Sequence, residues 1–222
     1  MSQDEWAATI ARTVGREVRR YRDQQGLSAE QLAQKCTSAG LPMKRPVIAN
    51  LESGRRPTVS LAELLILGKV LEVPPLLLVF PVGRDEMTEV VPGREVPTWL
   101  AAKWFTGEEP LPWKTPDGWA VSPEDWGAWQ DGAEPVDRFR THDRYISEWE
   151  GARGRAAAAR DAARAAQGDA ERDAFLMAAQ AEEQQARFIE RSMQENRAGM
   201  RRAGLKPHPL APLLAHLDEE RP

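Results

Sequence analysis

The segment from Gln24 to Pro57 reads QQGLSAEQLAQKCTSAGLPMKRPVIANLESGRRP and contains two short helical patterns joined by a turn. In the first pattern Ser28 is followed three residues later by Gln31, which is the Ser-x-x-Gln capping box that satisfies free amide groups at a helix start. We therefore expect a helix that begins at Ala29. The residues 37–42, TSAGLP, favour turns and should end it.

The second pattern opens at Pro46, because the fixed φ of proline suits the first turn of a helix. Gly54 ends it, and the residues expected to face inward are Val47, Ile48 and Leu51. Two short helices joined by a turn are typical of a helix-turn-helix, in which the second helix enters the major groove of DNA.

Apolar residues on both sides of this pair predict three further helices. An amphipathic stripe at steps of four, four and three precedes the pair, formed by Ile10, Val14, Val18 and Tyr21. After the pair, Ser60 can cap a helix that runs to about Leu71, and Pro74-Pro75 introduces a short apolar helix over residues 76–80, which is too short to cross a bilayer. Residues 8–82 should therefore form a five-helix domain.

Two stretches of this segment, LSAEQLA at residues 27–33 and IANLESG at residues 48–54, resemble the bacterial lambda-repressor-like regulators of the XRE family. The first resembles the entry to the family's second helix and the second its recognition helix. The turn between the helices is longer than is usual in the family, and Ala29 stands where the family often has a glutamine that touches phosphate. The resemblance implies a mainly α, DNA-binding fold over about residues 8–82.

The resemblance also implies contacts with DNA. Arg45 suits the O6 and N7 atoms of guanine, Asn50 suits N6 and N7 of adenine, and Pro46 can add only an apolar contact to a base. The residues expected to bind phosphates are Ser28, Lys44, Ser53, Arg55 and Arg56. The alternative is that Asn50 is simply an exposed helix residue and that the two arginines are solvated charges favoured by the helix dipole.

Composition and charge agree with a protein that acts on DNA inside the cell. Residues 1–82 carry 11 Lys and Arg against 8 Asp and Glu, whereas residues 83–222 carry 19 against 26, so the basic part coincides with the motif. The single Cys36 has no partner for a disulfide or a metal, and the first residues, MSQDE, lack the pattern of a signal peptide. We expect a cytoplasmic protein that does not bind to membranes.

Nothing in the sequence supports an enzyme, a cofactor or a metal centre. It contains no phosphate-binding glycine loop, no nucleophile motif and no HExxH pattern. The histidines have no cysteine or carboxylate at ligand spacing, so we expect surface positions for His142, His208 and His216.

The segment after the five helices is rich in tryptophan. Residues 83–98 mix Gly, Pro and charged residues and are expected to be a linker, with one strand at 88–91. A Trp-rich connector at 99–132 follows, and seven of the eight tryptophans lie within residues 99–149. These side chains could line a ligand pocket, or they could anchor loops in a segment that has few other large apolar residues. We favour the second interpretation.

Residues 133–203 are rich in Ala, Arg, Glu and Gln and predict a long helical region, either a coiled coil or a hairpin. Gly168 divides it into helices expected at 135–167 and 169–203. An approximate heptad seam suggests dimerisation through Phe175, Ile189 and Met193, although a solvated Ala-rich helix is the alternative. A Pro-rich tail at 204–222 could fold onto the helices or stay mobile.

Together these features favour a homodimeric, sequence-specific transcription regulator whose partner is double-stranded DNA, with residues 46–53 in the major groove. Two other functions stay open. The chain could be an adaptor that binds another protein through its C-terminal helices and Trp-rich segment, or a regulator that responds to a small molecule.

Overall fold

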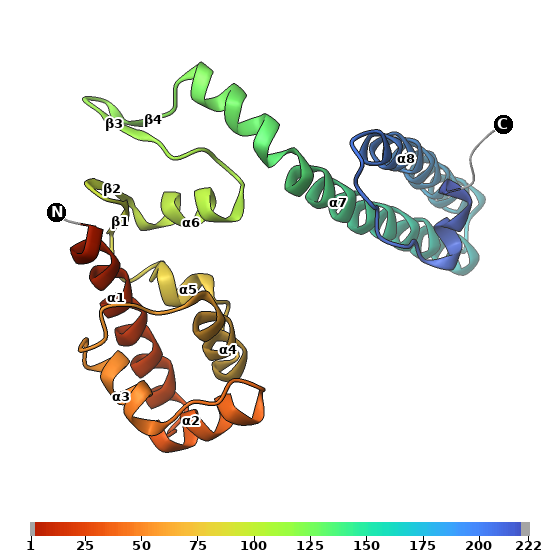
Figure 1. Ribbon diagram of the computed structural model, residues 1–222. Helices are drawn as coiled ribbons and strands as arrows, with labels where there is room; N and C mark the ends of the chain where they lie inside the picture. The colour runs from red at the N-terminus through yellow and green to blue at the C-terminus, as the bar shows by residue number, and fades with distance from the viewer. Residues whose placement is uncertain (1–2, 219–222) are drawn as a thin grey trace. The chain divides into compact units, whose positions relative to one another are not determined.

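In a computed structural model of the protein, residues 3–218 are described. The chain divides after Gly127 into two compact units, which are treated separately below. Figure 1 shows that helices dominate both units. This confirms the mainly α fold expected from the sequence, with a helical N-terminal domain and a long C-terminal helical region.

Five helices form the first part of the N-terminal unit. They are α1 (Gln3–Gln24), α2 (Ala29–Ser38), α3 (Arg45–Glu52), α4 (Leu61–Leu71) and α5 (Leu76–Val79). They enclose one apolar core whose fully buried members include Val14, Val18, Leu32, Ile48, Leu51, Leu67 and Leu78. Helix α1 packs against α3, α4 and α5, and α2 packs against α3 and α4, so the two helices of the helix-turn-helix share the core of the whole domain.

The predicted starts of α2, α3 and α4 agree closely with the structure. Ser28 caps α2, since its Oγ accepts from the Gln31 amide at 3.1 Å while the Gln31 side chain accepts from the Ser28 amide at 2.8 Å. Ser60 caps α4 in the same way, together with Glu63. Helix α3 begins at Arg45, one residue before the predicted start.

The expected linker at residues 83–98 is a β-hairpin. Strands β1 (Met87–Val91) and β2 (Arg94–Pro97) pair antiparallel, whereas the sequence had suggested only the first strand. Gly93 makes the tight turn possible with a φ of 76°, and its amide donates to the Glu89 carboxylate at 2.7 Å. The hairpin and helix α6 (Thr98–Thr106) bury a small second core that includes Phe80, Val90, Val96 and Ala101.

Strands β3 (Trp113–Thr115) and β4 (Gly118–Ala120) form another short hairpin. The tryptophans around it do not converge on one pocket. Trp104 and Trp119 pack against the second core, whereas Trp99 and Trp113 are each 55% exposed. The Arg94 guanidinium lies 3.5 Å from the centre of the Trp113 ring.

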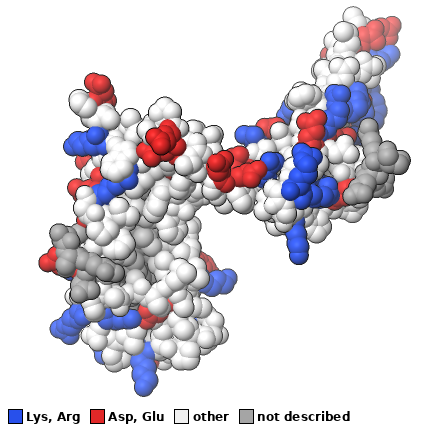
Figure 2. All heavy atoms as spheres, turned by 45° about the horizontal axis from the view of Figure 1, so that its top comes forward, with Lys and Arg blue, Asp and Glu red and all other residues white. Residues whose placement is uncertain are grey.

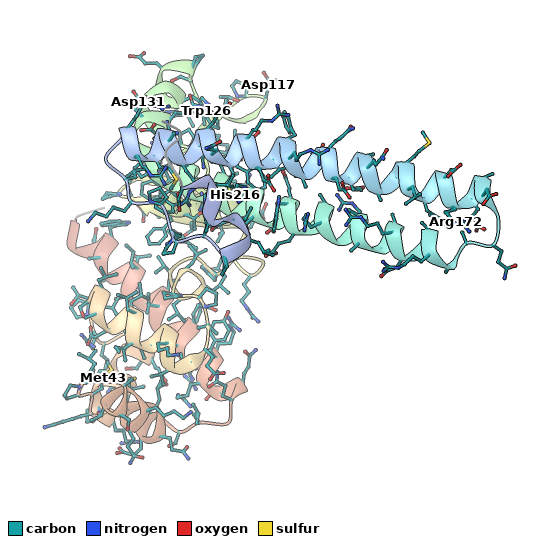
Figure 3. All side chains as sticks on the ribbon, turned by 90° about the vertical axis from the view of Figure 1, so that its right-hand side faces the viewer. Met43, Asp117, Trp126, Asp131, Arg172 and His216 are labelled. Carbon is teal, nitrogen blue, oxygen red and sulfur yellow. The ribbon has the colours of Figure 1, made fainter. Side chains whose placement is uncertain are left out.

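The C-terminal unit, which includes α7 from Ala128 onward, is an antiparallel helical hairpin. Helix α7 (Pro123–Ala165) and helix α8 (Asp169–Arg202) lie side by side (Figures 1 and 3). Arg155 Nε donates to Glu182 at 2.9 Å, and Trp149 Nε1 donates to Glu190 at 2.8 Å, which fixes the opposite directions of the two helices. Of the two arrangements that the sequence left open, the structure has the hairpin.

Helix α7 begins well before the expected residue 135. Ser122 starts it, because its Oγ accepts from the Asp125 amide at 3.0 Å and its carbonyl accepts from the Trp126 amide at 3.0 Å. Pro135 therefore lies inside the helix, where it removes one backbone hydrogen bond without ending the helix. The glycine that divides the region is Gly168, as expected, and it is the N-cap residue of α8.

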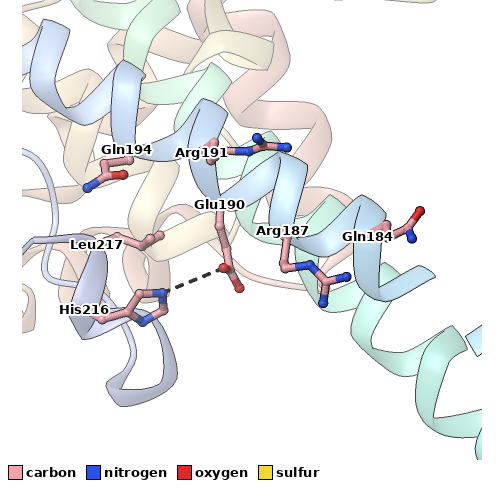
Figure 4. A pocket seen from close by; sticks show the side chains of 7 residues that line it. All are labelled: Gln184, Arg187, Glu190, Arg191, Gln194, His216 and Leu217. Carbon is pink, nitrogen blue, oxygen red and sulfur yellow. Dashed lines mark ion pairs between the residues drawn. The ribbon is translucent and has the colours of Figure 1, made fainter. Parts of the chain in front are cut away.

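The tail folds back onto the hairpin. Its 3-10 helix η1 (Pro212–Leu217) buries Leu214 and Leu217 beside α8 (Figure 4). The buried Arg197 of α8 holds the end of the tail, since its guanidinium makes two hydrogen bonds of 2.7 Å to the Asp218 carboxylate.

One histidine is placed differently from the prediction. His142 was expected on the surface, yet it is 3% exposed, and Arg197 Nη1 donates to its Nε2 over 2.8 Å. Burial and the neighbouring Arg197 charge lower the pKa of His142, so the ring is neutral. In residues 3–218 no helix is long and apolar enough to span a membrane.

Candidate nucleic-acid interface

Side-chain and backbone hydrogen bonds fix the turn that joins α2 to α3. The Thr37 Oγ1 accepts from the Met43 amide at 3.1 Å and lies 3.0 Å from the Ala33 carbonyl, to which it donates. The Leu41 amide donates to the Cys36 carbonyl at 3.1 Å. The Met43 side chain reaches the core (Figure 3). The long turn is therefore ordered, and it sets the direction of α3 relative to α2.

A buried ion pair holds the far end of α3. Arg22 Nε and Nη2 donate to the two oxygens of Glu52 at 2.6 and 2.8 Å, and Arg22 Nη1 also donates to the Leu27 carbonyl at 2.6 Å. The two side chains are only 11% and 9% exposed. The hydrogen bonds to Glu52 raise the pKa of Arg22 above its ordinary value. One guanidinium thus joins α1, the α1–α2 turn and α3.

Helices α1 and α3 approach each other so closely that a side chain cannot fit between them. A Cβ atom added to Gly15 would lie 2.1 Å from the carbonyl oxygen of Leu51 and 2.8 Å from its carbonyl carbon. Both atoms belong to the backbone, so neither can rotate away. The absence of a side chain at Gly15 therefore determines how deeply α3 sits against the domain.

The predicted base-reading residues lie on the outer side of α3. Ile48 and Leu51 are fully buried, whereas Arg45 and Pro46 are exposed and Asn50 is partly exposed. Within the described residues, no hydrogen bond occupies the Asn50 side-chain amide. The Asn50 carbonyl accepts from the backbone amides of Arg55 and Arg56 at 3.0 and 3.2 Å. These hydrogen bonds fold the following loop against α3.

The predicted phosphate-binding residues differ in their exposure and in the contacts that their side chains make within the protein. Lys44 at the N-terminal end of α3 and Arg55 beyond its C-terminal end are exposed. Ser28 is exposed at the start of α2, and Ser53 is exposed while its hydroxyl donates to the Asn50 carbonyl at 3.3 Å. These four exposed groups therefore lie at the two ends of α3 and at the N-terminus of α2.

Arg56 is engaged within the protein. Its guanidinium donates to both oxygens of Glu63 at 2.7 and 3.1 Å, and its side chain is 27% exposed. Hydrogen bonding from Arg56 lowers the pKa of Glu63, so this carboxylate stays charged. The pair ties the loop after α3 to the first turn of α4.

Arg12 is a cation near the interface that the sequence did not single out as a binding residue. Its side chain passes within 3.2 Å of the place where a Cβ on Gly54 would stand, at the C-terminal end of α3. Other arginines of α1 are neutralised, since Arg16 pairs with Asp85 and Arg20 pairs with Glu17. On the face shown in Figure 2, the Lys and Arg side chains of the N-terminal unit stand apart from one another.

The predicted dimerisation residues lie within the hairpin of a single chain. Ile189 and Met193 are 3% and 0% exposed and pack in a cluster with Trp149 and Ala152 of α7. Phe175 is partly exposed near the other end of α8. The predicted seam on α8 is therefore apolar, but in this structure it packs against α7 of the same chain.

Comparison with known proteins identifies the class of the N-terminal domain. Residues 13–78 match a family model described as a helix-turn-helix domain. No curated protein and no solved structure matches the chain. The α2–turn–α3 geometry agrees with this match to a helix-turn-helix domain, which suggests DNA binding.

Proposed function

We propose that the protein is a sequence-specific regulator of transcription, of the XRE class, that binds duplex DNA as a homodimer. The observation that carries the proposal is the outer face of α3, where Arg45 and Asn50 project from a helix whose opposite face is buried in the domain core. An arginine and an asparagine five residues apart on a helix can each make a paired contact with a purine in the major groove.

The surrounding polar groups suit contacts with the DNA backbone. Lys44 and Arg55 flank the two ends of α3, and free amide groups at the start of α2, next to Ser28, attract phosphate through the helix dipole. Arg55 is the better candidate of the arginine pair for phosphate, because the guanidinium of Arg56 already satisfies Glu63. These groups would orient α3 without reading sequence.

Selection of bound fragments from genomic DNA tests this function. We expect the wild-type protein to enrich a pseudo-palindromic site, and Arg55→Ala to weaken all sequences alike and to flatten the slope of log affinity against log salt by about one unit. Arg19→Ala is the matched control, since Arg19 is an exposed arginine on α1 that pairs only loosely with Asp23 at 3.7 Å. Equal affinity for every fragment would refute sequence-specific binding.

Exposed aromatic residues favour a second candidate function, an adaptor that binds another protein. Trp99, Phe105 and Trp113 are each more than half exposed, and large exposed aromatics are typical anchors of protein interfaces. For an adaptor, Trp99→Ser would abolish regulation in cells while the affinity for DNA stayed unchanged. Unchanged regulation in Trp99→Ser and Trp113→Ser would exclude these side chains as anchors.

A further inference from the structure

Helix α8 carries a second heptad stripe in addition to the one that packs on α7. Its members are spaced by alternate steps of four and three residues, and they are Ala170, Ala174, Met177, Ala181, Gln184, Phe188, Arg191 and Glu195. At 100° per residue this stripe lies on the side of α8 opposite to Ala179, Ala186 and Met193, which are buried against α7.

The second stripe exposes large apolar side chains. Met177 is 70% exposed and Phe188 is 57% exposed, and the neighbouring Leu176 is 43% exposed. Figure 3 shows the side chains of α8 that point away from α7, with Arg172 near the closed end of the hairpin. A solvated helix does not need large apolar groups in heptad register on its outer face, so this face fits a further helix.

We propose that this face of α8 binds the same face of α8 in a second copy of the chain, in antiparallel orientation. The stripe is self-complementary when the twofold axis passes between Ala181 and Gln184. Met177 then packs on Phe188 of the second copy, and Ala174 lies opposite its Arg191. The inference supplies the surface for the homodimer of the proposed function, and it does not depend on which DNA is bound.

Charge supports the antiparallel direction. The exposed Asp173 flanks the stripe near the N-terminal end of α8, and the exposed Arg191 belongs to the stripe near the other end. Antiparallel pairing brings Asp173 of each copy beside Arg191 of the other, so the contact forms twice. A parallel pairing in register would instead place Asp173 beside Asp173 of the second copy and Arg191 beside its Arg191, so that like charges would meet.

The small side chains and the limited length predict a weak dimer. From residue 170 to residue 195 the stripe is about 37 Å long at the rise of an α-helix. A face of this length and about 10 Å width buries roughly 750 Å² over both copies, less than the 1,200 Å² at the lower end for stable complexes. Two half-sites on one DNA molecule would hold two copies of the chain close together. The raised effective concentration would then favour the dimer.

Figure 4 shows the tail beside α8, where Gln184 and Arg191 of the stripe line the cleft next to it. His216 and Leu217 of η1 lie beside Glu190 and Gln194, at one flank of α8, where they enclose a cleft of about 610 Å³. His216 pairs with Glu190 at 3.8 Å on the same flank. The cleft therefore borders the stripe at Gln184 and Arg191, while Met177 and Phe188 are exposed.

Sedimentation of the full-length protein from about 2 to 300 µM tests the interface, a range suited to a weak contact. We expect the wild type to dimerise within it, and the double variant Met177→Glu with Phe188→Glu to raise the dissociation constant at least tenfold. Arg172→Glu is the control, because it changes the net charge by the same amount at an exposed position outside the stripe. A wild type that stays monomeric, or a double variant that dimerises equally well, overturns the proposal.

Charge reversal tests the direction. Asp173→Arg and Arg191→Asp should each weaken the dimer at least threefold, and the two together should restore it. Failure of the double variant to recover contradicts the antiparallel contact. Both groups are exposed, so neither change should unfold the helix, and unchanged far-UV circular dichroism verifies this.

Cross-linking tests the register independently. Ala170→Cys mixed with Glu195→Cys should give a disulfide-linked dimer on mild oxidation. Ala170→Cys alone should not, because its two copies would lie about 37 Å apart. The native Cys36 is buried, and burial raises the pKa of its thiol, so it should not interfere. A dimer linked by Ala170→Cys alone would overturn the antiparallel register.

The double variant Met177→Glu with Phe188→Glu also separates this inference from the proposed function. It should bind a single DNA half-site with wild-type affinity and lose only the gain from a second half-site. If sequence-specific binding were lacking in the wild type while the dimer formed as described, the proposed function would fail and the interface would stand.

Discussion

Replacing Gly15 by alanine should show how strongly the α1–α3 contact determines the position of α3. The new methyl group would overlap the Leu51 carbonyl, which lies 2.1 Å from the Cβ position, so the helices must separate by at least about 1.3 Å to reach ordinary contact. Overpacking of this kind costs about 1–3 kcal/mol, and the better helix propensity of alanine returns about 1 kcal/mol. Because the overlapped atoms belong to the backbone and cannot rotate away, we expect the upper end of this cost and a net loss of about 2 kcal/mol in the free energy of unfolding.

Urea unfolding of the full-length protein, followed by a signal from the N-terminal unit, measures this loss. Gly154→Ala is the control, because a Cβ at Gly154 meets no atom within 4 Å and the change should stabilise α7 slightly. The displaced α3 should also reduce the preference for specific over bulk DNA. If Gly15→Ala were as stable as the wild type and equally specific, the close backbone contact would have no role in placing α3.

Two further predictions concern ion pairs near α3. Arg22→Met should destabilise the domain by about 2–4 kcal/mol in urea unfolding, because it leaves Glu52 buried without a partner, and adding Glu52→Leu should recover much of the loss. Arg56→Ala should destabilise by about 1 kcal/mol at neutral pH. Because Arg56 lowers the pKa of Glu63 in the folded state, this contribution is present above the unfolded pKa of about 4.3 and is lost as pH falls through the folded value. A constant difference between Arg56→Ala and the wild type from pH 7 to pH 3 would contradict the role of the pair.

The helix-turn-helix could be predicted from the sequence because local signals specify it. Ser28 with Gln31 defines the start of α2 within a few residues, and Gly54 ends α3 with a φ of 70°. Such signals act over one helical turn and do not depend on the rest of the fold. The outward position of Asn50 follows in the same way from the burial of Ile48 and Leu51, because helical periodicity turns it away from them.

Features that depend on distant residues could not be predicted. The Arg22–Glu52 pair joins residues that are 30 positions apart, and nothing local marks either as buried. Arg56 is equally plausible as a phosphate ligand and as the partner of Glu63 until the loop is placed. The Pro-Gly-rich composition of residues 83–98 masked a hairpin, since strands of four and five residues provide little periodicity.

The heptad pattern on α8 could be recognised from the sequence, but the helix that it contacts could not. The pattern correctly indicated that Ile189 and Met193 face another helix, but a heptad does not state whether that helix belongs to the same chain or to a second copy. Pro135 led to a wrong helix start at residue 135. A proline inside a long helix costs one hydrogen bond, and the rest of α7 can offset this cost.

The most direct test of sequence-specific DNA binding is the affinity of the wild type and of Arg45→Ala for a selected site in which every base pair is replaced in turn. We predict that Arg45→Ala weakens binding to the intact site by about 1–3 kcal/mol and removes the preference at one base pair of each half-site, while the other preferences stay. A uniform loss of affinity with every base preference intact would contradict the assignment of α3 as the helix that reads the DNA.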